Sequence, residues 1–180
     1  KDDKRWAEPG FCIAQEQFVL DEYNFVSLAS KQESEIEVEE KPEFFQISGK
    51  RYEIKIDKSG AVVEYNFKEN EIIKKSLIPY FWKVPNNNQE GNDYVERVGA
   101  WKYAGQNRSV ENIERMRLGN GNVRISFNMA LMKNSDYDLV YTINSQGYIQ
   151  VEAHYQPNAK VNIPLMPKFG MKMAIREQFD

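Results

Sequence analysis

The sequence predicts an all-β fold: an antiparallel β-sandwich with at most one short helix. Three observations lead to this prediction. Apolar and polar residues alternate along several short segments, which is the period of a half-buried strand. Segments rich in Gly, Asn, Asp and Ser separate these runs at intervals of roughly 8 to 15 residues. The resulting total of about eight short strands favours a sandwich over a helical or mixed fold.

The first part of the chain predicts one strand and an acidic segment. Residues 11–20 form a mostly apolar run after the turn dipeptide Pro9-Gly10, which predicts a strand. Residues 31–40 carry alternating carboxylates that would repel one another along a strand face. We interpret this acidic segment as a solvated linker or an exposed edge strand and place a domain boundary near residue 41. Paired catalytic carboxylates are not expected there, because nothing nearby would separate their pKa values.

A hairpin follows the predicted boundary. Residues 52–56 alternate strictly between apolar and charged types, and residues 57–60 have the composition of a turn. On the second strand we expect Val63, Tyr65 and Phe67 to share the buried face. Together the two runs predict a β-hairpin.

A second hairpin is centred on the Gly-Asn-Gly-Asn segment at 119–122. Residues 123–131 alternate apolar and polar types throughout, and this turn composition is typical of a hairpin. Residues 110–118 are then the partner strand. The alternative is a short helix, because Val110, Ile113 and Met116 are spaced by three.

The remaining elements are two strands and one helix. Residues 137–143 and 149–155 predict strands joined by a turn at 145–147. Residues 94–103 predict the one helix, although Gly99 weakens it by about 1 kcal/mol relative to Ala. His154 falls on the polar side of its strand, so we interpret it as a surface residue rather than a catalytic base.

Composition excludes several classes of function. The 24 basic and 27 acidic residues give a net charge of −3, which argues against nucleic acid as a partner. No apolar run is long enough to cross a membrane. One Cys and one His cannot build an internal disulfide or a zinc site of the Cys/His type.

The unusual stretch is residues 77–105, where a Pro-bounded aromatic strand precedes a polar loop. Aromatic faces stack on the C–H surfaces of sugars, and amides bind hydroxyl groups. The alternative is a surface loop whose Asn residues serve only turn geometry. The candidate residues for a substrate-rim loop are Asn86, Asn87, Asn88, Gln89, Gly91, Asn92 and Asp93, and those for sugar stacking are Trp82 and Trp101.

Residues 78–92, Ile-Pro-Tyr-Phe-Trp-Lys-Val-Pro-Asn-Asn-Asn-Gln-Glu-Gly-Asn, resemble the Pro-Asn-Phe-Trp-Arg-Ala-Pro-Thr-Asp-Asn-Asp-x-Gly-Asn segment of glycoside hydrolase family two β-galactosidases. Trp101, Ala104 and Gly105 fit the Trp-x-x-Ala-Gly that follows, and 141–151 and 165–171 resemble later motifs. These segments belong to the family's C-terminal small-chain domain. Residues 7–18 resemble the end of the preceding immunoglobulin-like domain.

The resemblance implies a galactose-mutarotase-like β-supersandwich over 42–180 and the end of an immunoglobulin-like domain, with the acidic linker, over 1–41. It also implies that the chain is a fragment of a β-galactosidase-like hydrolase. The two catalytic Glu residues of a retaining glycosidase and the magnesium and sodium sites lie in other domains of that family, so no catalytic or metal residue is expected here. The partners implied are a carbohydrate substrate and the other domains of the same chain. Gly91 matches a mobile glycine of the rim loop.

The loop also departs from the family pattern. Asn87 and Gln89 replace two Asp residues, and an amide supplies no negative charge. Lys83 and Lys168 replace Arg, with loss of bidentate geometry. The competing interpretation of the chain is a non-catalytic carbohydrate-binding module. A homo-oligomer is a further expectation, since cut strand edges invite self-association. The compartment, cytoplasmic or periplasmic, is not readable from the sequence.

Overall fold

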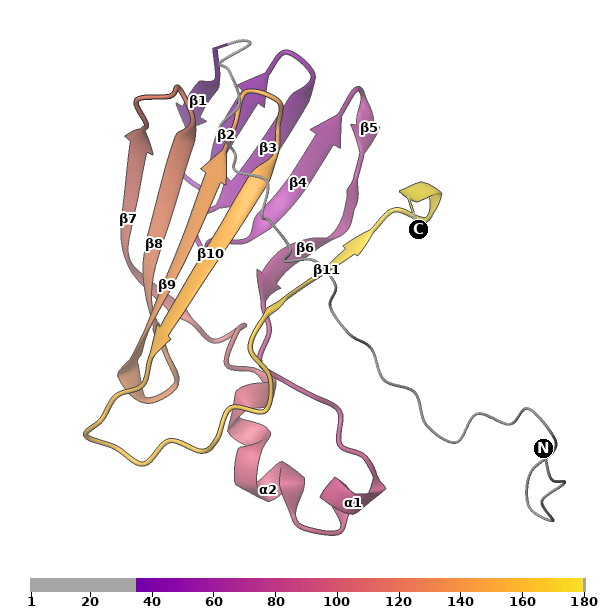
Figure 1. Cartoon of the computed structure of the whole chain (residues 1–180), viewed down its shortest axis with the longest axis vertical. Helices are drawn as coiled ribbons and strands as arrows, with labels where there is room; N and C mark the ends of the chain where they lie inside the picture. Colours follow the sequence, from indigo (N-terminus) through magenta and orange to yellow (C-terminus); the bar gives the residue numbers. More distant parts are fainter. Residues whose placement is uncertain (1–34, 180) are drawn as a thin grey trace, which may run out of the picture.

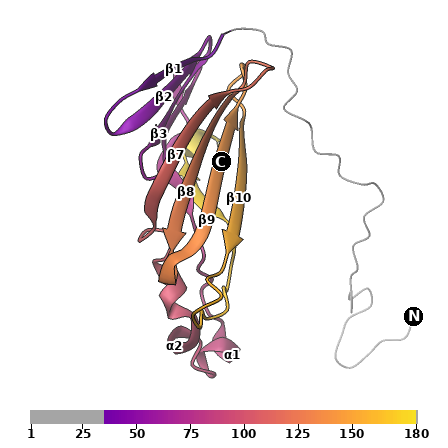
Figure 2. The same cartoon turned by 90° about the vertical axis from the view of Figure 1, so that its left-hand side faces the viewer.

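The computed structural model describes residues 35–179. The predicted strand at 11–20 and Cys12 lie outside the described residues. Figures 1 and 2 show two antiparallel sheets stacked as layers, with short helices at one end. The all-β sandwich prediction is therefore confirmed. The galactose-mutarotase-like supersandwich and the domain division at residue 41 stay predictions.

The first sheet has the order β1-β2-β3-β4-β6-β11 in the described part of the chain, and β5 pairs with β4. Its strands are, in chain order, β1 (Glu37–Glu40), β2 (Phe44–Gly49), β3 (Tyr52–Asp57), β4 (Val62–Phe67), β5 (Asn70–Glu71), β6 (Ile73–Pro79) and β11 (Met171–Ile175). The last strand joins this sheet from the far end of the sequence by pairing with β6.

The second sheet has the order β10-β9-β8-β7. Its strands are β7 (Ser109–Arg117), β8 (Val123–Leu131), β9 (Ser135–Ile143) and β10 (Ile149–Gln156). The helical elements are α1 (Asn87–Glu90), α2 (Tyr94–Val98) and the 3₁₀ turns η1 (Gly99–Lys102), η2 (Met132–Asn134) and η3 (Glu177–Phe179). The predicted helix at 94–103 is present as α2 continued by η1, and α1 adds one further turn.

The two predicted hairpins form as expected, and residues 109–117 are a strand rather than a helix. Along β3 the residues alternate between buried and half-buried, and β8 buries its apolar side in the same way. Gly60 and Gly121 take φ of 77° and 81° in the two turns, a conformation that favours glycine.

One inward-facing residue was predicted wrongly. A register shift in the β3–β4 pairing places Val62, rather than Val63, opposite Ile56. Val62 is buried, while Val63 is 37% exposed. A β-bulge of this kind inserts one residue and reverses the faces on one side of it. Tyr65 and Phe67, which lie after the bulge, face inward as predicted, whereas Val63 does not. The alternation of residue types in the sequence gives no sign of the bulge.

The acidic segment ends in an edge strand, as one of its two interpretations predicted. β1 pairs antiparallel with β2 at the edge of the first sheet. Its Glu37, Glu39 and Glu40 are exposed, and Lys58 forms an ion pair with Glu40 at 2.6 Å. Ile36, just before the strand, is completely buried. Carboxylates on an edge strand discourage further pairing with another chain.

The core between the sheets is closed by tyrosine hydroxyls that donate to turns of the opposite sheet. Tyr52 donates to the carbonyl of Asn144 at 3.0 Å, and Tyr65 donates to that of Gly147 at 2.9 Å. In the other direction, Tyr141 donates to the carbonyl of Gly60 at 2.8 Å. Each bond satisfies a turn carbonyl while the ring fills the core. Burial raises the pKa of Tyr52 to about 12.

We predict that Tyr141→Phe destabilises the fold by about 1 to 3 kcal/mol, because it leaves the buried carbonyl of Gly60 without its donor. Urea unfolding followed by circular dichroism measures this change. The control is Tyr103→Phe, since that ring is 53% exposed and its hydroxyl makes no hydrogen bond within residues 35–179. Equal midpoints for the two variants would contradict the prediction.

Candidate functional site

The predicted site lies on residues 80–105, a segment that leaves the first sheet at the end of β6 and that we call the excursion. The aromatic strand predicted before it is shorter than expected: β6 ends at Pro79, and the segment from Tyr80 onward is not a strand. The chain returns at Gly105, where an added Cβ would lie 2.1 Å from the carbonyl oxygen of Pro79. Glycine at position 105 is therefore required by a close approach of the backbone to itself.

A cluster of aromatic rings, which we call the aromatic base, fixes this excursion to the sandwich. Its members are Phe81, Trp101, Tyr137, Tyr155 and Phe169. Most of the pairs meet edge to face, the geometry that the ring quadrupoles favour. The rings come from the excursion, from β9 and β10, and from the segment before β11. Segments far apart in the sequence are thus held together at the helical end.

Trp101 joins two rings of the aromatic base, Phe81 and Tyr155. Its ring is 1% exposed, and its indole Nε1 donates to the carbonyl of Pro164 at 2.9 Å. Ala104 is also buried. The Trp-x-x-Ala-Gly residues of the sequence therefore act together in packing the excursion against the fold.

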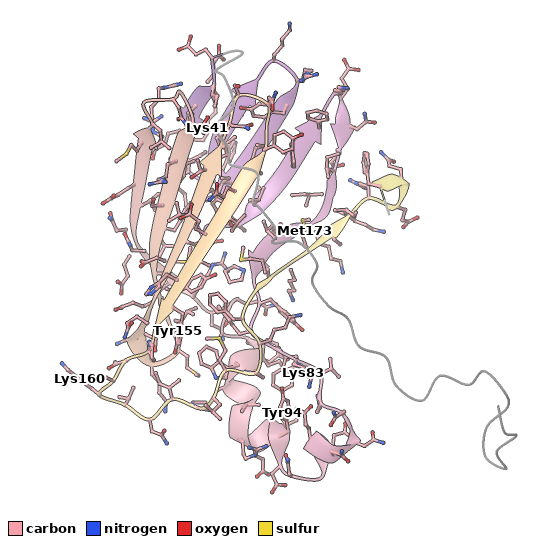
Figure 3. All side chains as sticks on the ribbon, viewed as in Figure 1. Lys41, Lys83, Tyr94, Tyr155, Lys160 and Met173 are labelled. Atoms are coloured by element: carbon pink, nitrogen blue, oxygen red, sulfur yellow. The ribbon has the colours of Figure 1, made fainter. Side chains whose placement is uncertain are left out.

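Trp82 packs on the α2 side of the excursion. It is 7% exposed, and its ring centroid lies 5.4 Å from that of Tyr94. The Tyr94 hydroxyl donates to the carbonyl of Lys83 at 3.1 Å. Figure 3 shows Lys83 and Tyr94 close together at the helical end of the molecule. The structure thus gives Trp82 and Trp101 packing roles, and in this conformation neither ring offers an open face for a sugar.

Two of the predicted rim residues cap α1. The Oδ1 of Asn86 accepts from the backbone N–H of Gln89 at 3.0 Å, and the Oε1 of Gln89 accepts from the N–H of Asn86 at 3.2 Å. This reciprocal pair is a capping box, which satisfies two backbone donors at the start of the helix. The amide of Gln89 is used here for local structure rather than for a ligand.

Two further candidates belong to the connection between α1 and α2. Arg97 donates from Nε to the carbonyl of Asn92 at 3.0 Å and from Nη2 to its Oδ1 at 2.8 Å. Asp93 precedes α2 with φ of 58°, and its side chain forms no capping bond. A left-handed conformation is uncommon for a residue other than Gly and more accessible to Asp than to most. Arg97 therefore fixes the backbone next to this turn.

The remaining candidates, Asn87, Asn88 and Gly91, are exposed. Asn87 and Asn88 lie on α1, and within the described residues their amide side chains form no hydrogen bond. Gly91 has φ of −68°, an ordinary helical value, and an added Cβ would lie 3.6 Å from the nearest atom. This conformation does not require glycine at position 91. A hinge role for Gly91 therefore depends on a second conformation of the loop.

The turn between β3 and β4 is tied to the return of the excursion by Arg108. Its guanidinium donates to the carbonyl of Ser59 at 2.8 Å, to the Ser59 hydroxyl at 2.9 Å and to the carbonyl of Gly105. Burial lowers the pKa of Arg108, and burial raises that of Tyr137 to about 12. Sequence reasoning did not single out Arg108, because a lone arginine after a loop carries no pattern.

Comparison with known proteins gives a consistent result. Residues 48–180 match the family described as beta galactosidase small chain. The chain is 25% identical over 180 residues to a beta-galactosidase of Priestia megaterium, covering 99% of this chain and 17% of that protein. It is 25% identical to a beta-galactosidase of Streptococcus thermophilus over 177 residues, or 97% of this chain and 17% of the relative. The chain thus spans about a sixth of the length of these two relatives.

We predict opposite results for two glycines of the excursion. Gly105→Ala should destabilise the protein by about 2 to 3 kcal/mol, because its Cβ has no room against the Pro79 backbone. Gly91→Ala should leave stability unchanged or raise it by up to about 1 kcal/mol, since alanine favours helical φ. Urea unfolding of both variants tests this contrast. Similar losses in the two variants would contradict it.

Proposed function

Because the chain belongs to the beta galactosidase small chain family, we propose that it is a non-catalytic part of a β-galactosidase-like glycoside hydrolase. In this proposal the parent protein hydrolyses terminal β-galactosides or related β-glycosides. Within that parent, the small-chain part acts as a scaffold and supplies a section of the active-site rim. Its partners are the carbohydrate substrate and the other domains of the same chain.

The observation that carries the rim role is the contrast between the base and the tip of the excursion. Phe81, Trp101 and Tyr137 of the aromatic base are each 1% exposed, whereas Asn87 and Asn88 are exposed and their amides form no hydrogen bond in the described structure. Figure 1 places α1 and α2 together at one end, beyond the strands of both sheets. A rigid support with exposed amides suits contacts to sugar hydroxyls, because positioning groups bind best when they are held in place beforehand.

The carboxyl groups support a non-catalytic role. A retaining glycosidase needs two carboxyl groups about 5 Å apart, with the pKa of the acid raised. Among residues 35–179, the carboxyl pKa values that depart from the ordinary range are those of Glu40 and Glu64, and both are lowered. Hydrogen bonds from Lys58 and Lys55 respectively are the main causes. A lowered pKa keeps a carboxylate ionised and is the opposite of what a general acid requires.

Metal ions and membranes have no place in the proposed role of this part. Among residues 35–179, no group of three or more His, Cys, Asp or Glu side chains gathers where it could hold a metal ion. In this proposal, magnesium and sodium belong to other domains of the parent. No helix within the described residues is long and apolar enough to span a membrane.

Self-association is a further part of the proposal. β10 and β11 each lie at the edge of a sheet in the described structure. Exposed strand edges pair readily with other strands. In the parent, another segment or subunit covers them, and the isolated chain dimerises or forms larger oligomers.

The purified chain is expected to show no turnover of a nitrophenyl β-galactoside. The reason is that, in this proposal, the acid and the nucleophile of the glycosidase lie in another domain of the parent. Release of nitrophenolate, followed by absorbance, measures this. Turnover that a substitution within residues 35–179 abolishes would contradict the proposal.

The rim role is tested in the full-length parent with Asn87→Ala combined with Asn88→Ala. We expect kcat/KM for a β-galactoside to fall about tenfold, because two hydrogen-bonding groups are lost near the substrate. The melting temperature should stay unchanged, since these amides make no hydrogen bond in the described structure. Gln106→Ala, an exposed amide outside the loop, is the matched control. Unchanged kinetics in the double variant would remove the loop from the site.

A further inference from the structure

A pocket of about 400 Å³ lies at the opposite end of the sandwich from α1 and α2. Figure 1 shows this end, where the β9–β10 turn faces the ends of β4 and β5. The pocket falls within the roughly 300 to 1,000 Å³ typical of small-molecule sites. Its lining residues are Arg51, Tyr65, Phe67, Ile72, Gln146 and Tyr148.

Tyr148 forms an exposed wall of the pocket, and hydrogen bonds hold the turn on which it lies. Its ring is 64% exposed. The side-chain Oδ1 of Asn144 accepts from the backbone N–H groups of Gln146 and Tyr148, both at 3.0 Å. The Tyr65 hydroxyl holds the same turn through the Gly147 carbonyl. An aromatic ring on so fixed a turn offers a stacking surface with little loss of entropy on binding.

The charge in the pocket is positive. The Arg51 guanidinium lies 6.0 Å from the centroid of the Phe67 ring, and the Lys68 ammonium lies 5.6 Å from it. No acidic side chain is among the lining residues, and within residues 35–179 Arg51 forms no ion pair. A guanidinium presents several donors in a planar arrangement that matches a carboxylate. An anionic group on the ligand would complete this arrangement.

The polar groups favour a sugar over an aromatic acid. The Tyr65 hydroxyl donates to Gly147 and can still accept, and the Tyr148 hydroxyl makes no hydrogen bond within the described structure. Hydroxyl groups of a sugar can pair with both, whereas an unsubstituted aromatic ring can pair with neither. Both kinds of ligand can stack on Tyr148, so the hydroxyls decide between them.

We propose that this pocket binds a pyranose bearing an acidic group, with its apolar face on Tyr148 and its anion at Arg51. The proposal does not rest on the activity of the parent protein. The recognition chemistry is the one that the sequence indicates for residues 86–93, but this pocket lies at the opposite end of the sandwich.

Isothermal titration of the 180-residue chain with methyl β-galacturonide, methyl β-galactoside and benzoate tests the proposal. We expect the galacturonide to bind saturably and at least tenfold more tightly than either other probe. Amide NMR shifts should concentrate at residues 51 and 144–148. Absence of saturation at about 20 mM galacturonide, equal binding of the neutral sugar, tighter binding of benzoate, or shifts centred on residues 86–93 would each overturn it.

Matched variants separate stacking from charge. Tyr148→Ala should weaken galacturonide binding at least tenfold, whereas Tyr103→Ala, another exposed tyrosine, should have no effect. Arg51→Gln should reduce the preference for the acidic sugar from tenfold to about onefold, and Lys50→Gln should preserve it. If Lys50→Gln removes the preference as fully as Arg51→Gln, the effect is general electrostatics and the proposal fails. Circular dichroism confirms that each variant is folded.

Discussion

The closure of the sandwich by large aromatic side chains is the constraint on which the rest of the structure depends. At one end, the hydroxyls of Tyr52 and Tyr65 reach from the first sheet to the β9–β10 turn of the second. In the reverse direction Tyr141 holds the Gly60 turn. Each ring fills space between the layers while its hydroxyl donates to a turn carbonyl of the opposite sheet. Alternation along the strands supplies the faces, but these bonds fix how the sheets meet.

Aromatic side chains hold the structure at both ends of the molecule, but the groups exposed at the two ends differ. At the helical end the buried rings of Phe81, Trp101 and Tyr137 support a polar tip that carries Asn87 and Asn88. At the other end the tyrosine-bound turn leaves Tyr148 exposed beside Arg51. In both places a rigid, buried set of contacts presents a small number of exposed groups. Such an arrangement lets a ligand bind with little loss of conformational entropy in the protein.

The family motif is a packing motif in this chain. Trp101, Ala104 and Gly105 bring the return of the excursion against the end of β6, and a side chain at position 105 would collide with the Pro79 backbone. The proposed contacts to the substrate therefore come from the residues between these anchors. Asn86 and Gln89 are less available for such contacts, because their side-chain oxygens accept the capping hydrogen bonds of α1. The proposed rim then depends on fewer residues than the composition of the loop suggests.

Local patterns in the sequence were enough to define most strands and their faces. Alternation over residues 123–131 and the Gly-Asn turn before them predicted a hairpin, because local periodicity and turn chemistry act between near neighbours. The ordered motifs also identified the family. Tertiary contacts were needed to establish that Val62 rather than Val63 faces inward, that Trp101 is buried, and that β11 joins the first sheet. The last two depend on contacts between residues distant in the chain, and the first depends on a bulge within the β3–β4 hairpin. A single sequence carries no signal of either.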